Sequence, residues 1–265
     1  MKKITYLLLI VMIAAVALTG CGVLQEPEAA SGTIEAIPLE TQSAGVAATE
    51  PALEPAPTEA QAEATTAPEP TAEAAAPTEA PVETAAGAPL LYTIDSAASE
   101  VRFQLDEDLR GVRTTVIGVT DQVAGQLSVN LVDLSQTQVG VIQINARTLV
   151  TDNNFRNRAI QNEILDTGSF EFITFTPTGI EGLPASATMG ETVTFTLVGD
   201  LTIRDVTLPA TFNVEATAVS ETQITGSATA VVNRADFGLQ IPSVPNVANV
   251  DEEVELYIDF TANGS

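Results

Sequence analysis

The stretch TVTFTLVGDLTIRDVTLPATFNVEAT, residues 192–217, decides the fold. Apolar and polar side chains alternate in two runs, and the runs meet at Arg204-Asp205. Alternation with a period of two is typical of a strand with one buried face, and a tight turn between two such runs predicts an antiparallel hairpin. The apolar positions are Val193, Phe195, Leu197, Leu201 and Ile203, then Val206, Leu208, Ala210, Phe212, Val214 and Ala216.

The same alternation recurs on both sides of this hairpin, for example in residues 101–105, 127–131, 224–232 and 254–260. Strands with one apolar and one polar face form antiparallel sheets that are solvated on one side only. About eight such strands must enclose their apolar faces, which a barrel or a sandwich does, and a barrel also removes the sheet edges. The sequence therefore predicts an all-β domain.

One segment has a different period. Phe155, Ala159, Ile160 and Ile164 follow helical spacing, and Thr151 or Asp152 is a suitable N-cap. We expect a single short helix that leans on the sheet.

Charge and composition exclude several classes of function. The 265 residues include ten Lys plus Arg and thirty-five Asp plus Glu, no His, and one Cys. The absence of His excludes Ser-His-Asp and Cys-His catalysis and His-ligated zinc, and one Cys cannot form an intrachain disulfide or a cysteine cluster. The net charge of −25 argues against a nucleic-acid partner. We expect no enzyme activity, no cofactor and no metal site.

Two short patterns imitate known sites. Asp236-Phe237-Gly238 matches the metal-binding motif of kinases, but this domain has neither the Lys nor the His that kinases need. We expect Arg234 to form an ion pair with Asp236 or to lock the turn there. The acidic runs at 106–108 and 251–253 lack the glycine and spacing of a calcium loop, so we interpret them as solvated loop charge.

The N-terminus predicts a targeting segment over residues 1–20. Lys2 and Lys3 precede an apolar run from 4 to 18, which is short for a membrane span and suits a signal peptide. Its end, Leu18-Thr19-Gly20-Cys21, resembles the bacterial lipobox, which implies acylation of Cys21 and a lipid anchor on the extracytoplasmic side of the cell envelope. An ordinary signal peptide and an uncleaved anchor remain the alternatives.

Residues 21–88 form the second part, a predicted tether behind the lipidated Cys21. Ala, Glu, Pro and Thr dominate it, and from residue 22 on it has twelve Glu, no basic residue and no aromatic residue. Such a composition cannot bury enough apolar area to fold, so we expect disorder. Fully extended, it would reach roughly 220 Å at about 3.3 Å per residue, and as a flexible coil about 45 Å. Residues 89–265 are the folded domain.

Four stretches of the domain resemble the YceI-like family: residues 92–103, 144–153, 199–209 and 233–239, within a likeness that spans 91–262. The resemblance implies an extracytoplasmic, lipocalin-like β-barrel that binds a polyisoprenoid or quinone-like lipid.

The chain also departs from that family pattern. The family often has His at two places that here hold Ala98 and the acidic run 106–108, and its Gly-x-Phe is replaced by Ala124-Gly125-Gln126. No property that depends on those histidines carries over to this chain.

The hypothesis is a surface-anchored carrier or scavenger of a long apolar lipid, without catalysis. The alternative is a tethered interaction or adhesion module with a filled barrel, because eight-stranded barrels are near the size that side chains alone can fill. Small residues at 226, 228 and 230 on one inward face favour a cavity. The sequence leaves a homodimer open. The predicted lipid-binding residues are Phe103, Ile144, Phe195, Leu201, Phe212, Ala228 and Ile258.

Overall fold

The predicted hairpin at Arg204-Asp205 is confirmed and forms the centre of the sheet. Strands β9 (Thr192–Ile203) and β10 (Val206–Ser220) pair in antiparallel register from Ile203↔Val206 to Thr192↔Thr217. Arg204 takes a positive φ of 57° in the turn. The register places the apolar side chains of both strands on the same face, as the alternation predicts.

The computed structural model describes residues 25–39 and 87–264, which belong to one compact unit. The predicted signal peptide, Cys21 and residues 40–86 of the predicted tether lie outside the described residues. Within the described ranges, no helix is long and apolar enough to cross a membrane.

Eleven further strands complete the antiparallel sheet, several of them only two to five residues long. They are β1 (Leu90–Ile94), β2 (Glu100–Leu109), β3 (Val112–Thr120), β4 (Val123–Ala124), β5 (Gln126–Val129), β6 (Gln138–Val139), β7 (Ile142–Asn145), β8 (Phe172–Glu181), β11 (Gln223–Asn233), β12 (Val247–Ala248) and β13 (Glu253–Gly264). Three short 3-10 turns lie between them: η2 (Ser96–Ala98), η3 (Leu134–Gln136) and η4 (Ala146–Thr148).

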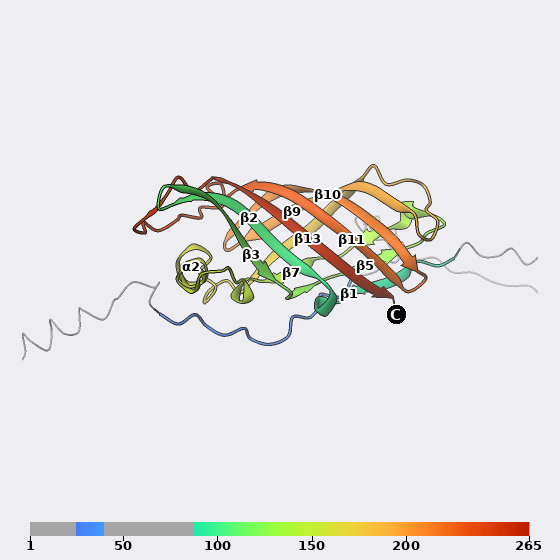
Figure 1. Cartoon of the computed structure of the whole chain (residues 1–265). Coiled ribbons are helices and arrows are strands. Elements are labelled where there is room, and N and C mark those ends of the chain that lie inside the picture. Colours follow the sequence, from blue (N-terminus) through green and yellow to red (C-terminus); the bar gives the residue numbers. More distant parts are fainter. Residues whose placement is uncertain (1–24, 40–86, 265) are drawn as a thin grey trace, which may run out of the picture. The chain divides into compact units, whose positions relative to one another are not determined.

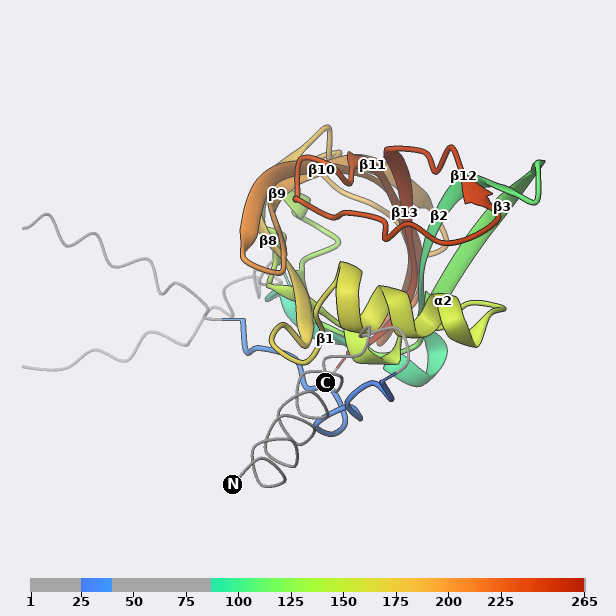
Figure 2. The ribbon, with the colours of Figure 1, turned by 90° about the vertical axis from the view of Figure 1, so that its left-hand side faces the viewer.

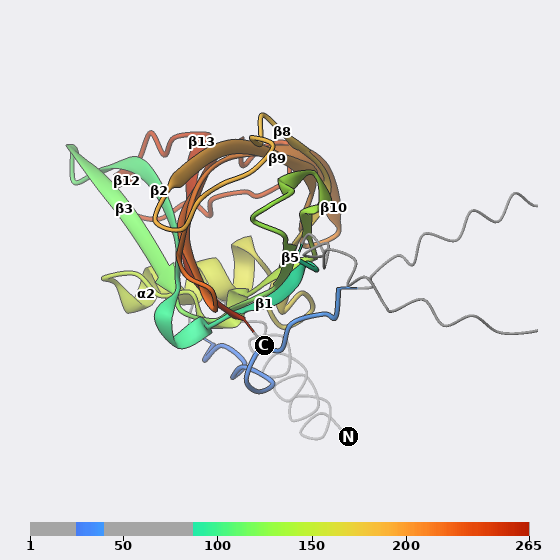
Figure 3. The ribbon, with the colours of Figure 1, turned by 90° about the vertical axis from the view of Figure 1, so that its right-hand side faces the viewer.

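The sheet curls into a half-barrel, which confirms the predicted all-β, lipocalin-like fold. Its order is β4-β7-β8-β9-β10-β11-β13-β1-β5-β6, and β2 joins it at β13 and carries β3 and β12. Seen end-on, β8 to β2 form an arch, and the helical segment lies beneath the arch (Figure 2). The opposite view shows the same curl, with β1 and β5 along its lower side (Figure 3).

The helical segment is α2 (Asn154–Ala159), which continues as the π turn η5 (Ile160–Ile164). Its N-cap is Asn153, whose Oδ1 accepts from the backbone N–H groups of Phe155 and Arg156. The predicted caps were wrong because both side chains have other partners: Thr151 Oγ1 donates to Asn157 Oδ1 at 2.7 Å, and Asp152 pairs with Arg156.

The acidic run 106–108 lies within β2 and not in a loop, which corrects the interpretation of solvated loop charge. Glu107 is buried and pairs with Arg156 Nη2 at 2.7 Å. Asp106 and Asp108 both pair with Arg113, at 3.6 Å. These carboxylates therefore have structural cation partners.

Arg234 locks a turn, one of the two roles expected of it. Its guanidinium donates to the backbone carbonyls of Leu239, Val250 and Asp251 at 2.9–3.3 Å. No ion pair between Arg234 and Asp236 occurs in the described part of the chain.

Residues 25–39, which we call the strap, lie along the outside of the domain beneath α2 and toward β1 (Figures 1 and 2). Asn162 of η5 donates to the carbonyl of Gln25 at 2.9 Å, and at the other end the N–H of Leu39 donates to Gln126 Oε1 of β5 at 2.9 Å. Ile34 is buried between these ends. The strap is thus an ordered segment inside a region for which the sequence predicted disorder.

Arg147 and Glu171 form the main polar contact of the strap. Their side chains pair at 3.2 Å, Arg147 also pairs with Glu28 at 3.1 Å, and Glu171 Oε1 accepts from the N–H and the Oγ of Ser31 at 2.8 and 2.9 Å. Asn145 donates to the same oxygen. A charge-assisted cluster with this little exposure fixes the strap more firmly than an exposed ion pair would.

Ile34 and Ile37 provide a matched test of strap docking, because Ile34 is 8% exposed and Ile37 is 42% exposed. We expect Ile34→Asp to release the strap, since the new carboxylate would have to lose its hydration. Ile37→Asp should leave it docked. Amide hydrogen exchange of residues 25–39 measures the difference, and equal protection in both variants would contradict the docking.

Acid should also release the strap. Although burial of Glu171 acts in the opposite direction, hydrogen bonds from Ser31 and Asn145 and the charge of Arg147 together hold its pKa below the ordinary value of about 4.5. A lowered pKa contributes stability that is present above the ordinary value and is lost as the pH falls through the lowered one. We expect exchange protection of the strap to decline in that acidic range, and Glu171→Gln to abolish this dependence.

Candidate functional site

The half-barrel contains two apolar cavities that share no lining residue. We call the first the loop cavity, because residues of the loop between β8 and β9 help to line it, and the second the helix cavity, because α2 and η5 help to line it. Their free volumes are about 120 Å³ and about 250 Å³. Both lie on the inner face of the sheet.

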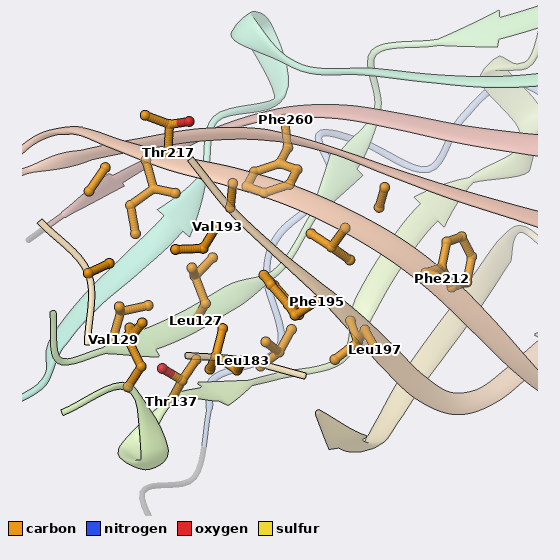
Figure 4. A pocket seen from close by; sticks show the side chains of 18 of the residues that line it. Leu127, Val129, Thr137, Leu183, Val193, Phe195, Leu197, Phe212, Thr217 and Phe260 are labelled. Atoms are coloured by element: carbon orange, nitrogen blue, oxygen red, sulfur yellow. The ribbon is translucent and has the colours of Figure 1, made fainter. Parts of the chain in front are cut away.

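The lining of the loop cavity is almost wholly hydrocarbon. Strands β5, β9, β10, β11 and β13 contribute aliphatic and aromatic side chains, and Figure 4 shows Phe195, Val193, Leu127 and Leu183 gathered on the inner side of the sheet. Phe175 and Phe212 meet edge to face, with ring centroids 4.8 Å apart. Such a lining offers contact area to an apolar ligand and has few polar groups that would lose hydrogen bonds to water when a ligand binds.

Three polar residues interrupt this lining: Thr137, Glu191 and Thr217. Glu191 accepts hydrogen bonds from Thr188, and Thr217 shares one with Thr192. The Thr137 hydroxyl is buried and has no hydrogen-bond partner among the described residues. A buried polar group normally has a partner, so this hydroxyl still has the capacity for a hydrogen bond with a group in the cavity.

The helix cavity is lined mostly by apolar side chains, and three charged residues interrupt this lining. Phe103, Val116 and Leu256 come from the sheet, and Ile160 and Ile164 come from η5. The charged lining residues are Glu107 and Arg156, which pair with each other, and Arg234, which bonds to backbone carbonyls. Glu107 and Arg156 thus compensate each other's charge, whereas Arg234 bonds to carbonyl oxygens and has no carboxylate partner among the described residues.

Three buried residues line neither cavity and lie between lining residues of the two. Leu201 lies on β9 between Leu197 of the loop cavity and Ile203 of the helix cavity. Ala230 holds the same place on β11, and Ile144 lies at the end of β7. We call Ile144, Leu201 and Ala230 the partition.

The predicted lipid-binding residues fall into three groups. Phe195, Phe212, Ala228 and Ile258 line the loop cavity, and Phe103 lines the helix cavity. Ile144 and Leu201 belong to the partition instead, because both are buried and line neither cavity. The structure thus brings five of the seven to a cavity wall. Whether any of them contacts a lipid stays a prediction.

Sequence patterning missed the part of the helix cavity that the segment 233–250 supplies. Phe237, Leu239 and Val244 line that cavity, although Phe237 belongs to the pattern that resembles a kinase motif. The apolar residues of this segment follow neither the period of a strand nor that of a helix. Periodicity therefore could not identify them as lining residues.

The small residues on β11 make room for a cavity only in part. Ala228 lines the loop cavity, whereas a Cβ on Gly226 would lie 2.6 Å from the ring of Phe260, so the space at Gly226 is already filled.

Removing the partition should join the cavities. Leu201 is only 2% exposed, so Leu201→Ala leaves a void and should cost about 2–5 kcal/mol of unfolding free energy. We expect the variant to stay folded and to accept a longer hydrocarbon chain than the wild type does. Competition between polyprenols of different length, read by mass spectrometry of the bound lipid, measures this, and an unchanged preference would contradict the role of the partition.

Comparison with known proteins identifies solved structures of similar fold and the family of this chain. Two solved structures are similar: a polyisoprenoid binding domain from Saccharophagus degradans implicated in plant cell wall breakdown, with a TM-score of 0.53 and 15% identity, and Burkholderia cenocepacia BcnA, with 0.50 and 17%. The alignments cover 66% and 63% of this chain and 99% and 98% of those chains. No curated protein matches. The YceI-like domain model matches residues 92–262, and the chain belongs to the YceI-like family.

Proposed function

We propose that this protein binds a long apolar lipid of the polyisoprenoid or quinone-like class, and carries or sequesters it without catalysis. The observation that carries the proposal is the pair of hydrocarbon-lined cavities inside the half-barrel of a YceI-like domain. A similar fold occurs in a protein described as a polyisoprenoid binding domain, which supports the same ligand class here.

Burial of hydrocarbon would drive binding. Each Å² of apolar ligand surface removed from water contributes about 25 cal/mol, and a lining with few polar atoms imposes little desolvation cost in return. The unpartnered hydroxyl of Thr137 favours a lipid with one oxygen-bearing end over a pure hydrocarbon. Both polyprenols and quinones have such an end.

The proposed setting is the extracytoplasmic face of the cell envelope, with the protein held by lipid chains on Cys21. The support is the sequence pattern of residues 1–21, since that cysteine is the only one in the chain. One acyl chain gives marginal membrane binding, so stable anchoring requires at least two.

Purification of the protein, followed by solvent extraction and mass spectrometry, tests the ligand. We expect a stoichiometric isoprenoid or quinone-like lipid, or uptake of such a lipid when it is added in detergent. A domain that is empty and binds neither would contradict the proposal and favour the interaction module.

Ala228→Phe and Val231→Phe form the matched pair for this test. Both lie on β11, but Ala228 lines the loop cavity and Val231 is 61% exposed. A phenyl group at 228 should fill the cavity and reduce lipid binding severalfold, while overpacking costs about 1–3 kcal/mol. The same group at 231 should leave binding unchanged. Thermal unfolding of both variants separates occlusion from misfolding.

Cys21→Ser tests the anchor separately. Because serine does not accept the acyl chains, we expect the variant to lose its membrane attachment. Fractionation of cells into membrane and soluble protein measures the change. Continued retention in the membrane fraction would contradict acylation at Cys21 and leave the lipid-binding proposal untouched.

A further inference from the structure

The strap limits where Cys21 can lie relative to the domain. The carbonyl of Gln25 accepts from Asn162 of η5, the Glu28 carboxylate pairs with Arg147, and Ser31 bonds to Glu171. Only three residues separate Gln25 from Cys21, so the two Cα atoms lie no more than about 14 Å apart. A lipid anchor on Cys21 would therefore lie near η5.

This placement changes the role of the long Ala/Glu/Pro/Thr-rich segment. Leu39 bonds to Gln126 on β5, and the chain returns to the same strand when Leu90 pairs with Val129. Residues 40–86 thus connect two points on the domain. They do not separate the domain from Cys21, although the sequence alone predicts a spacer of tens of Å.

The end of the half-barrel that the strap marks also presents apolar side chains. Phe155 is 63% exposed, and Asn162 follows it by seven residues, which is about 10 Å along a helix. Val244 is exposed as well, and both Phe155 and Val244 line the helix cavity. Val112 is exposed nearby, since it pairs with the cavity residue Leu109. We call Val112, Phe155 and Val244 the apolar rim.

We propose that the strap holds this apolar rim against the lipid bilayer, so that the helix cavity opens toward the membrane. The inference rests on the proposed anchor at Cys21 and names the bilayer surface as the partner of the rim. Exposed apolar groups beside a covalent lipid anchor gain burial in the acyl region at little further entropic cost, because the anchor already confines them. An apolar lipid would then pass between bilayer and cavity without crossing water.

The charges around the rim determine the choice of lipid for a test. Arg156 pairs with Glu107 and Asp152, and Arg113 pairs with Asp106, Asp108 and Asp251, so carboxylates outnumber guanidinium groups in both clusters. An anionic surface would repel these two clusters, although it would attract Arg110 and Arg158, which lie at the same end and have no ion pair among the described residues. Vesicles of zwitterionic phosphatidylcholine avoid that repulsion.

The chain has no Trp, so a single substitution creates a local fluorescent probe. Phe155→Trp places the probe on the rim, and Val219→Trp places it near the β10–β11 turn, at the loop-cavity end. The acylated protein is reconstituted in vesicles with brominated acyl chains, which quench Trp at close range. We expect Phe155→Trp to lose most of its fluorescence and Val219→Trp to keep it.

If the proposal is correct, the quenching at position 155 depends on docking of the strap, and two further substitutions test this dependence. Adding Ile34→Asp to the Phe155→Trp chain should restore its fluorescence, and adding Ile37→Asp should not. Replacing residues 41–85 by a short Gly/Ser linker should leave the quenching as it was. Equal quenching at both probes, no quenching at Phe155→Trp, or insensitivity to Ile34→Asp would overturn the proposal.

Coupling the Cys21 thiol to a maleimide-bearing lipid distinguishes a failure of the proposed anchor from a failure of the proposed membrane contact. It gives the same attachment point whether or not a cell acylates that residue, so a cell that does not acylate Cys21 contradicts the anchor alone. Lipid extraction reports the binding function independently of either result. Lack of quenching in the chemically coupled, correctly folded protein would contradict the rim as a membrane surface.

Discussion

The core, the cavities and the position of the helical segment all depend on the apolar inner face of a single antiparallel sheet. Strands β8 to β11 and β13 each have apolar side chains on one face only, and a sheet with one apolar face must bend around that face or bury it against another layer. Here it bends. The arch leaves an open side, and α2 with η5 covers it by placing Ala159 and Ile160 against the core.

Incomplete filling of that interior creates the candidate site. Ile144, Leu201 and Ala230 are buried, line neither cavity and occupy the interior between the two. On either side, Ala228 and the spacing between β2 and η5 leave room that no protein atom occupies. Cavities are unfavourable in a core that serves stability alone, so two of them in one small domain suit a protein whose apolar ligand completes the packing.

The polar groups on the outside have a different task. Arg147 and Glu171 join η4, the start of β8 and the strap through charge-assisted hydrogen bonds, and Asn145 orients the carboxylate from within the sheet. Arg156 joins α2 to β2 through Glu107. These contacts hold the cover of the barrel and the N-terminal segment in one arrangement, which is what links the proposed anchor to one particular cavity.

Sequence alone determined the long alternating strands, the hairpin at Arg204-Asp205, the short helix and the family, because each depends on local alternation or on residues adjacent in the chain. It did not mark β3 or β8, and it predicted about eight strands where the sheet has thirteen. It also marked five residues that line the cavities, since inward positions follow from period two. Only the tertiary structure decided that Ile144 and Leu201 divide the interior, that Phe237 and Val244 line it, and that residues 25–39 dock. These outcomes depend on contacts such as Ser31 with Glu171 and Gln25 with Asn162, between residues more than a hundred positions apart, which leave no periodic trace in the sequence.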